Sequence, residues 1–197
     1  MNGFDVMLID AKGFGLSSGT RRGGVLLEDG LEQIGLMLQK QRKDKPTFII
    51  AHSMGCINTE NFLTNNRDIN VAGVVYTTPF FEFSKHGKVT LDRKILGRLV
   101  KMMGEELILN SVLQVSWLSK CKLFWRNSMS VLNGTTHPTV SGQSFSSMVD
   151  CVQDVQDNQH NHTVPYLLLL AGKDKIVDNV GANNFFDATT KVPAGHK

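Results

Sequence analysis

The chain has 197 residues, of which 41% are hydrophobic and 20% charged, and its formal net charge is +3. This composition is ordinary for one globular domain with a sizeable core. No basic stripe interleaved with aromatic residues accompanies the small positive charge, so we expect no nucleic-acid partner. No run of about 18 apolar residues predicts a membrane-spanning helix, and no signal peptide is visible.

The three cysteines, Cys56, Cys121 and Cys151, lie far apart and form no C-x-x-C pair. Their spacing indicates neither a disulfide framework nor a zinc site, which fits a reducing compartment. We therefore expect a cytoplasmic protein, with association to a membrane as the variant, and we expect no metal ion and no cofactor.

Strand-like and helix-like patterns alternate along the chain. Residues 6–9 form a short continuous apolar run that predicts a strand buried on both faces. Residues 12–24 are rich in Gly and Ser and predict a loop, and apolar residues at helical spacing over 27–38 predict an amphipathic helix. The same reading predicts buried strands at 47–51 and 71–77, a strand at 166–171, and helices at 57–63 and 180–186.

Strands that alternate with helices predict a parallel sheet with right-handed crossovers. The third and fourth strands are separated by a long stretch, about 80–163, with a helical pattern over 95–107 and a polar part from Asn127 onward. An insertion at the carboxyl end of a sheet strand is where a lid or a substrate-binding cap belongs. We therefore expect a cap over about 80–163.

The strongest local signal is Ala51-His52-Ser53-Met54-Gly55, between a buried strand and a helix. A serine hydroxyl becomes a useful nucleophile when a base reaches it and developing charge is stabilised. A sharp strand-to-helix turn exposes the serine and points the N–H of Met54 at the reacting carbonyl as an oxyanion donor. Small flanking residues suit a tightly packed turn. The alternative is a serine in an ordinary turn.

A second signal is Gly172-Lys173-Asp174, directly after the fourth strand. A carboxylate there can accept the N–H of a catalytic histidine and stabilise the imidazolium. Asp178 is the competing carboxylate, but its place in the loop favours a role as the cap of the helix near Val180.

Three segments together resemble the monoacylglycerol lipase and lysophospholipase group, the serine aminopeptidase-like α/β-hydrolases. They are residues 10–17 (DAKGFGLS), residues 52–55 (HSMG) and residues 172–178 (GKDKIVD). The resemblance implies an α/β-hydrolase fold, with a mostly parallel sheet, flanking helices and a cap insertion. It also implies a serine esterase or lipase that cleaves acyl esters of monoacylglycerol or lysophospholipid type through an acyl-enzyme. In that scheme Ser53 is the nucleophile, Asp174 the acid and Met54 an oxyanion donor.

The resemblance also implies parts that the 197 residues lack. The catalytic histidine should follow the acid after one more strand, yet His196 is the only histidine after Asp174 and no strand-like run precedes it. We expect His196 to be a solvated terminal residue, and the alternative is that it serves as the catalytic base. His52 should point away from the nucleophile. The remaining histidines precede the acid, and most histidines so placed are surface residues: His86, His137, His160 and His162.

The front of the fold is incomplete in the same way. In the family, the loop with the second oxyanion donor follows the third strand of the sheet, and both should precede residue 10. That missing family strand belongs between the strands predicted at 6–9 and 47–51. Without it, two rows of backbone groups stay unpaired or the two strands meet directly. We therefore expect residues 1–197 to be a partial α/β-hydrolase domain, a fragment with an incomplete sheet that lacks both ends and is inactive as written.

The cap segment carries considerable apolar surface. Some of it could line an acyl-chain tunnel or touch a membrane surface, or it could form a small core of the cap itself. Two other functions stay open: a non-catalytic hydrolase-fold binding protein, and an acyltransferase or thioesterase that uses the same serine. The apolar residues are Phe80, Phe81, Phe83, Met102, Met103, Trp117, Phe124 and Trp125.

Overall fold

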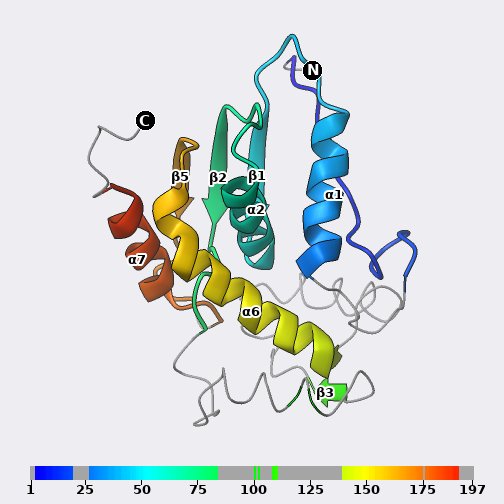
Figure 1. The fold of residues 1–197 in the computed structure, drawn as a ribbon, viewed down its shortest axis with the longest axis vertical. Helices are drawn as coiled ribbons and strands as arrows, with labels where there is room; N and C mark the ends of the chain where they lie inside the picture. Colours follow the sequence, from blue (N-terminus) through cyan, green and yellow to red (C-terminus); the bar gives the residue numbers. More distant parts are fainter. Residues whose placement is uncertain are drawn as a thin grey trace.

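The computed structural model describes residues 3–19, 27–83, 100, 102, 108–110, 139–174 and 176–190. Its centre is a parallel three-stranded sheet of β1 (Phe48–His52), β2 (Gly73–Thr77) and β5 (Tyr166–Leu169), in the order β1-β2-β5 (Figure 1). Helices lie between consecutive strands along the chain, as right-handed α/β connections require. The predicted α/β class and the strands predicted at 47–51, 71–77 and 166–171 are confirmed.

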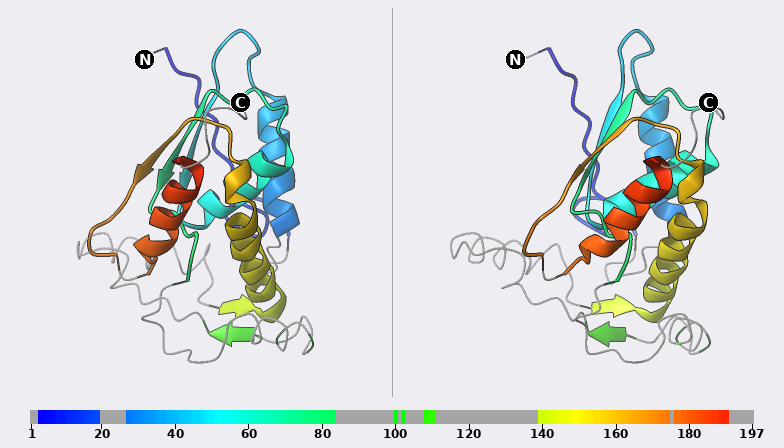
Figure 2. Two further views of the ribbon diagram at one scale, coloured as in Figure 1. Left: turned by 60° about the vertical axis from the view of Figure 1, so that its left-hand side comes forward. Right: turned by 90° about the vertical axis from the view of Figure 1, so that its left-hand side faces the viewer.

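The described helices lie on one side of this sheet (Figure 2). They are α1 (Leu27–Gln39), α2 (Met54–Asn65), α6 (Gly142–Asn158) and α7 (Asn179–Thr190), with a short 3-10 turn η1 (Gln159–Asn161) after α6. The helices predicted at 27–38, 57–63 and 180–186 are confirmed as α1, α2 and α7. Helix α6 falls in the polar stretch for which the sequence predicts no helix.

Helix α2 is the innermost helix, since it contacts α1, α6 and β1. Its buried side chains include polar ones: Thr59, Glu60 and Asn61 are each at most 3% exposed. The amide Nδ2 of Asn61 donates to the carbonyl of Cys151, 3.1 Å away, and so joins α2 to α6. The hydrophobic core is continuous around this helix and includes Ala51, Cys56, Ile57, Phe62, Leu63, Val71, Val74, Tyr76, Phe81, Cys151, Val152, Val155 and Phe185.

The opposite face of the sheet is open in the part of the chain that the structure describes. The outward side chains of β1 and β5 are exposed: Phe48 by 61%, Ile50 by 77%, Leu167 by 54% and Leu169 by 48%. Register places Ile50, Val75 and Leu167 in one row across this face. The expectation that the strand at 47–51 is buried is therefore wrong for one of its faces, because no described helix covers that face.

Residues 4–10 do not form the strand that their apolar run predicts. They are extended without ladder pairing, and Val6 and Leu8 are 78% and 89% exposed. The Asp5 carboxylate holds the segment beside the turn before β1 through ion pairs with Arg42 at 3.7 Å and Lys45 at 3.4 Å. A burial prediction fails here because β-structure needs a hydrogen-bonding neighbour, and none lies among the described residues. An incomplete sheet is expected either to leave backbone groups unpaired or to bring residues 6–9 directly against β1. Among the described residues, the backbone groups of 6–9 are unpaired.

Most of the predicted cap, including nearly all of 95–107, lies outside the described residues. Its described parts are a two-stranded antiparallel pair, β3 (Ile108–Asn110) with β4 (Thr139–Ser141), and helix α6. Helix α6 packs on α2 and contributes to the main core, and the cap over about 80–163 stays a prediction. Among the helices described, none is both long and apolar enough to cross a bilayer.

Gly181, in the first turn of α7, provides a test of the packing between α7 and the segment after β2. A Cβ at Gly181 would lie 2.7 Å from the backbone nitrogen of Glu82 and 2.9 Å from the carbonyl carbon of Phe81. We expect Gly181→Ala to lower the free energy of unfolding by about 1–2 kcal/mol, because overpacking of ~1–3 kcal/mol exceeds the helix-propensity gain. Gly55→Ala, in the first turn of α2 where an added Cβ meets nothing described within 4 Å, is the matched control. Urea denaturation in which both variants behave alike would contradict the packing.

Candidate active site

Ser53 stands between β1 and α2 in a backbone conformation that L-residues rarely adopt, with φ 51° and ψ −118°. Three backbone hydrogen bonds hold it there: its N–H donates to the carbonyl of Thr77, and its own carbonyl accepts from the N–H groups of Cys56 and Phe80. Such strain costs on the order of 1–3 kcal/mol and persists only when surrounding contacts impose it. The turn at Ser53 is therefore sharp and fixed by its neighbours.

The hydroxyl of Ser53 is not used to cap the helix that follows. Serine at an N-cap position commonly accepts a hydrogen bond from the second or third helical N–H, but Ser53 makes no such side-chain bond. The residue is half-buried at the carboxyl end of β1. Among the described residues nothing bonds its hydroxyl, which leaves it available for an external partner.

The backbone N–H of Met54 begins helix α2. The first N–H groups of a helix have no intrahelical acceptor and carry the positive end of the helix dipole. Met54 follows Ser53 directly and is 42% exposed, so the residue lies at the surface of the core. This placement suits an N–H that would bind a developing negative oxygen beside Ser53.

Tight packing of the turn does not explain the glycine at position 55. A Cβ at this position would meet no atom of the described residues within 4 Å. Ala51 on the other side of the turn is buried, at 6% exposure. Among the described residues, nothing at Gly55 requires the absence of a side chain.

A second strained residue stands at the end of the neighbouring strand. Thr78 has φ 42°, follows β2, and donates its N–H to the carbonyl of Leu169 at 2.7 Å. Its hydroxyl lies 3.3 Å from Nδ1 of His52, which also contacts the hydroxyl of Thr77 at 2.8 Å. In the sequence, Thr78-Pro79 marks only the end of the strand, and no local pattern predicts a role for the two threonines. Strained residues thus occupy the carboxyl ends of both β1 and β2.

Asp174 follows β5 and uses only one oxygen for the local fold. Its Oδ1 accepts from the N–H groups of Ile176 at 2.8 Å and Val177 at 3.0 Å, and no described group bonds Oδ2. Asp178, the competing carboxylate, accepts from the N–H of Val180 at 3.0 Å and caps α7. The predicted capping role of Asp178 is confirmed. Asp174 keeps one carboxylate oxygen for a further donor.

Sheet register places the two predicted residues on one edge of the molecule. His52 is opposite Thr77, and Thr77 is opposite Leu169, so β1, β2 and β5 end together. Ser53 follows the first of these strands and Asp174 lies in the loop after the last. The loops beyond β2 and β5 also meet, through a bridge between Phe83 and Val177. The fold therefore brings both residues to the same edge, one on each side of β2.

No described residue serves as the base between them. The described residues after Asp174 include no histidine, and His196 lies outside the described part. The His52 ring is exposed and bonded to Thr77. His160 is exposed as expected, and His86 and His137 are not described. His162 is not on the surface: it is buried against Glu60, with 3% of its side chain exposed. The surface expectation is wrong for this histidine because a buried carboxylate supplies its partner.

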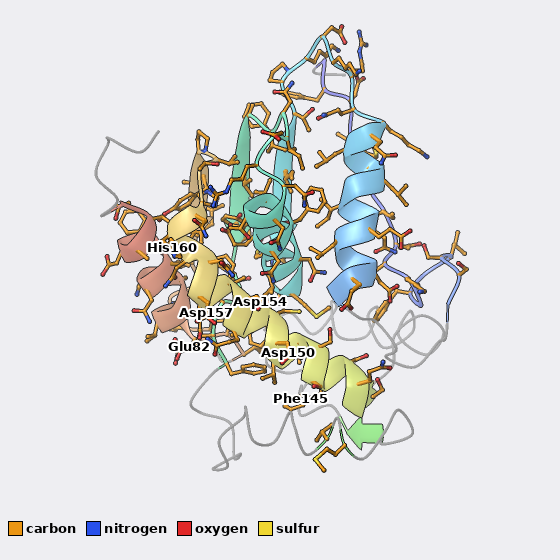
Figure 3. All side chains as sticks on the ribbon, viewed as in Figure 1. Glu82, Phe145, Asp150, Asp154, Asp157 and His160 are labelled. Atoms are coloured by element: carbon orange, nitrogen blue, oxygen red, sulfur yellow. The ribbon has the colours of Figure 1, made fainter. Side chains whose placement is uncertain are left out.

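A cysteine nucleophile and a metal site have weaker support than a serine nucleophile. Burial raises the pKa of the Cys56 thiol to about 12, so the cysteine three residues after Ser53 is not a thiolate nucleophile at neutral pH. Helix α6 carries an acidic row of Asp150, Asp154 and Asp157 (Figure 3), in which partial burial and the two neighbours raise the pKa of Asp154. No group of three or more acidic, histidine or cysteine side chains suited to a metal ion is found among the described residues.

The loop after residues 4–10 has a geometry that explains its glycines. Gly13 and Gly15 have φ 81° and 52°, and the Asp10 carboxylate accepts from the N–H of Leu16 at 3.0 Å. A Cβ at Gly15 would lie 2.2 Å from Cγ of Asp10. The glycine at position 15 is thus required because the Asp10 carboxylate occupies the inside of the loop.

Known proteins share this fold. The family pattern of serine aminopeptidase, S33, matches residues 1–193. The crystal structure of a monoacylglycerol lipase from Paleococcus ferrophilus is similar, with a TM-score of 0.75 and 22% identity, over 89% of this chain and 65% of that one. A soluble variant of monoglyceride lipase from Saccharomyces cerevisiae, in complex with a substrate analog, has a TM-score of 0.72 and 17% identity, over 91% and 62%.

A relative by sequence is an abhydrolase domain-containing protein of Dictyostelium discoideum, which is 25% identical over 190 residues. The match covers 94% of this chain and 19% of that protein. The chain thus spans a fifth of this relative and less than two thirds of either lipase. Since the S33 pattern covers nearly every residue and the described sheet and helices agree with it, the chain belongs to the serine aminopeptidase S33 family of α/β-hydrolases.

Proposed function

We propose that the protein hydrolyses acyl esters, with Ser53 as the nucleophile that forms an acyl-enzyme. The observation that carries this proposal is the strained turn at Ser53, whose hydroxyl does not cap α2. Strain of this kind is concentrated at functional sites, where it orients a reacting group. The similarity to two structures named as monoacylglycerol and monoglyceride lipases supports the same reaction class.

In the proposed reaction, the Ser53 hydroxyl attacks the ester carbonyl and its proton passes to a histidine. The negative oxygen of the tetrahedral intermediate binds the N–H of Met54, where the helix dipole of α2 also favours it. Collapse of the intermediate leaves the acyl group on Ser53, and the departing alcohol takes the proton back from the histidine. A water molecule then gives a proton to the histidine as it attacks the acyl group, and Ser53 recovers that proton when the acid leaves. The free oxygen of Asp174 would accept the N–H of the histidine and stabilise its charged form. The histidine itself has no assigned position.

The proposed substrate is a small lipid ester, of monoacylglycerol or lysophospholipid type. Of the apolar residues expected near the acyl chain, Phe81 is only 1% exposed, and Phe80 and Phe83 pack against the core, so these three support the scaffold. Met102 is 83% exposed. The other four residues of that group lie outside the described part. In the proposal, these four residues bind the acyl chain or contact the membrane.

Replacement of Ser53 by alanine should abolish ester hydrolysis by the protein at its natural length. We expect kcat/KM for a monoacylglycerol to fall by a factor on the order of 10⁴ or more, because the covalent step is lost. Ser18→Ala, on an exposed side chain, is the matched control and should leave the rate unchanged. Retained hydrolysis in Ser53→Ala would contradict the proposal, and a wild type that binds ester without turnover would indicate a binding protein. Product analysis with glycerol and thiol acceptors separates hydrolysis from acyl transfer.

Two aspartates four residues apart allow a matched comparison of the acid. Asp174→Asn preserves an acceptor for the N–H groups of Ile176 and Val177 but removes the charge, so we expect kcat to fall by up to about 10⁴ with stability maintained. Asp178→Asn keeps a good N-cap for α7 and should change neither activity nor stability. Steady-state kinetics in which Asp178→Asn is the more damaging variant would assign the acid to the other carboxylate.

A further inference from the structure

The loop that carries Asp174 is closed by a side chain to which the proposed reaction gives no role. Asn179 begins α7 and is half-buried. Its amide Nδ2 donates to the carbonyl oxygen of Ala171, 3.0 Å away. Ala171 lies just after the end of β5. The bond therefore ties the start of α7 to the end of the strand and closes the stretch of chain that holds Asp174.

The carbonyl oxygen of Ala171 also anchors Asp174 directly. The backbone N–H of Asp174 donates to it at 3.4 Å, so its two recorded donors are this N–H and the amide of Asn179. A carbonyl oxygen has two lone pairs and can accept both. An N–H···O bond is strongest at about 2.9–3.0 Å and weakens beyond that distance. The amide of Asn179 is therefore the stronger of the two anchors.

The remaining bonds of Asp174 lie within its own loop. Oδ1 accepts from the N–H groups of Ile176 and Val177, and Val177 is 6% exposed and forms the bridge to Phe83. These bonds fix the carboxylate relative to the loop. The direction of its free oxygen, Oδ2, then depends on how the loop is held relative to β5. The bond from Asn179 to Ala171 acts at that point.

Asn179 is not needed as the cap of α7. Asparagine is common at helix starts because its side-chain oxygen can accept a hydrogen bond from a helical N–H. Here the Asp178 carboxylate accepts the N–H of Val180 at 3.0 Å and fills that role. The recorded bond of Asn179 is a donated one, to a carbonyl outside the helix. Its amide therefore serves the loop and not the helix.

We propose that Asn179 is a positioning residue for ester hydrolysis, which holds the loop so that the free oxygen of Asp174 can accept the N–H of the histidine. This inference rests on the proposed function and adds a residue of α7 to its machinery. Without the amide, the carbonyl of Ala171 keeps only the longer of its two recorded bonds, and the loop can shift relative to β5. Catalysis is sensitive to such a shift, since a displacement of about 1 Å can lower the rate by roughly a hundredfold.

Asn179→Ala removes the donor and leaves Asp174 in place. We expect kcat for a monoacylglycerol to fall on the order of tenfold with KM unchanged, because the acid acts in the chemical step and not in substrate binding. Asn183→Ala, on an exposed side chain of the same helix, is the matched control and should keep the wild-type kcat. Steady-state kinetics of the protein at its natural length measures both values, and urea denaturation checks that each variant is folded.

The decisive comparison repeats Asn179→Ala in the Asp174→Asn background. Once the charge of Asp174 is removed, Asn179 has no catalytic carboxylate left to orient. We therefore expect Asn179→Ala to change the residual kcat of Asp174→Asn by less than about twofold. A residue that only supports the fold would lower kcat by the same factor in both backgrounds. Equal factors, or a wild-type kcat in Asn179→Ala alone, would overturn the proposal.

Asn179→Leu fills similar space without a donor, and it replaces the alanine variant, with the same expected factors, should that variant fail to fold. Failure of this proposal is distinct from failure of the proposed function. Retained hydrolysis in Ser53→Ala would contradict the nucleophile. An unchanged kcat in Asp174→Asn would contradict the acid and the role of Asn179 together, whereas equal factors in the two backgrounds contradict the role of Asn179 alone.

Discussion

The left-handed turn at Ser53 is the constraint on which the remaining geometry depends. A non-glycine residue at φ 51° is stable here because the carbonyl of Thr77 on the next strand and the first turn of α2 accept and donate the backbone bonds. Those partners are available only if β1 and β2 are parallel and in the observed register. The same register brings β5, and with it Asp174, to the same edge of the sheet. Strain at one residue is thus maintained by the pairing of three strands.

Helix α2 links this turn to the core. It contacts neighbouring helices and a strand, and two of its buried polar residues have defined partners: Asn61 bonds the backbone of α6, and Glu60 bonds Tyr76 and His162. Buried polar groups that are fully bonded favour one orientation of a helix over its alternatives. The direction in which α2 presents Met54 and Ser53 is therefore set by contacts two turns away as well as by the sheet.

The sequence is sufficient to predict the parts of this fold that local patterns determine. Apolar runs and helical spacing locate β1, β2, β5, α1, α2 and α7 to within a few residues, and His52-Ser53-Met54-Gly55 locates the turn. Asp178 is identified as a cap because its position before a helix is a local property. These signals need no knowledge of which segments meet in space.

The sequence-based predictions that are wrong or missing concern residues whose partners are distant in the chain. Residues 6–9 have the composition of a buried strand, but burial requires a neighbour that the described residues do not supply. Helix α6 has a narrow apolar face within a polar sequence, and its core contacts reach α2 some ninety residues earlier, as Asn61 and Cys151 show. His162 resembles a loop histidine until Glu60, 102 residues away, is placed beside it. Thr78 reveals its strain only in three dimensions.

The central claim is that Ser53 is a chemically distinct serine. A fluorophosphonate reacts covalently with an activated serine hydroxyl, and peptide mass mapping of the labelled native protein identifies the residue. We expect one phosphonylated peptide that contains Ser53, and no label when the protein is denatured before it meets the probe. Labelling of another serine, or an unlabelled Ser53 in a native protein that hydrolyses acyl esters, would contradict it.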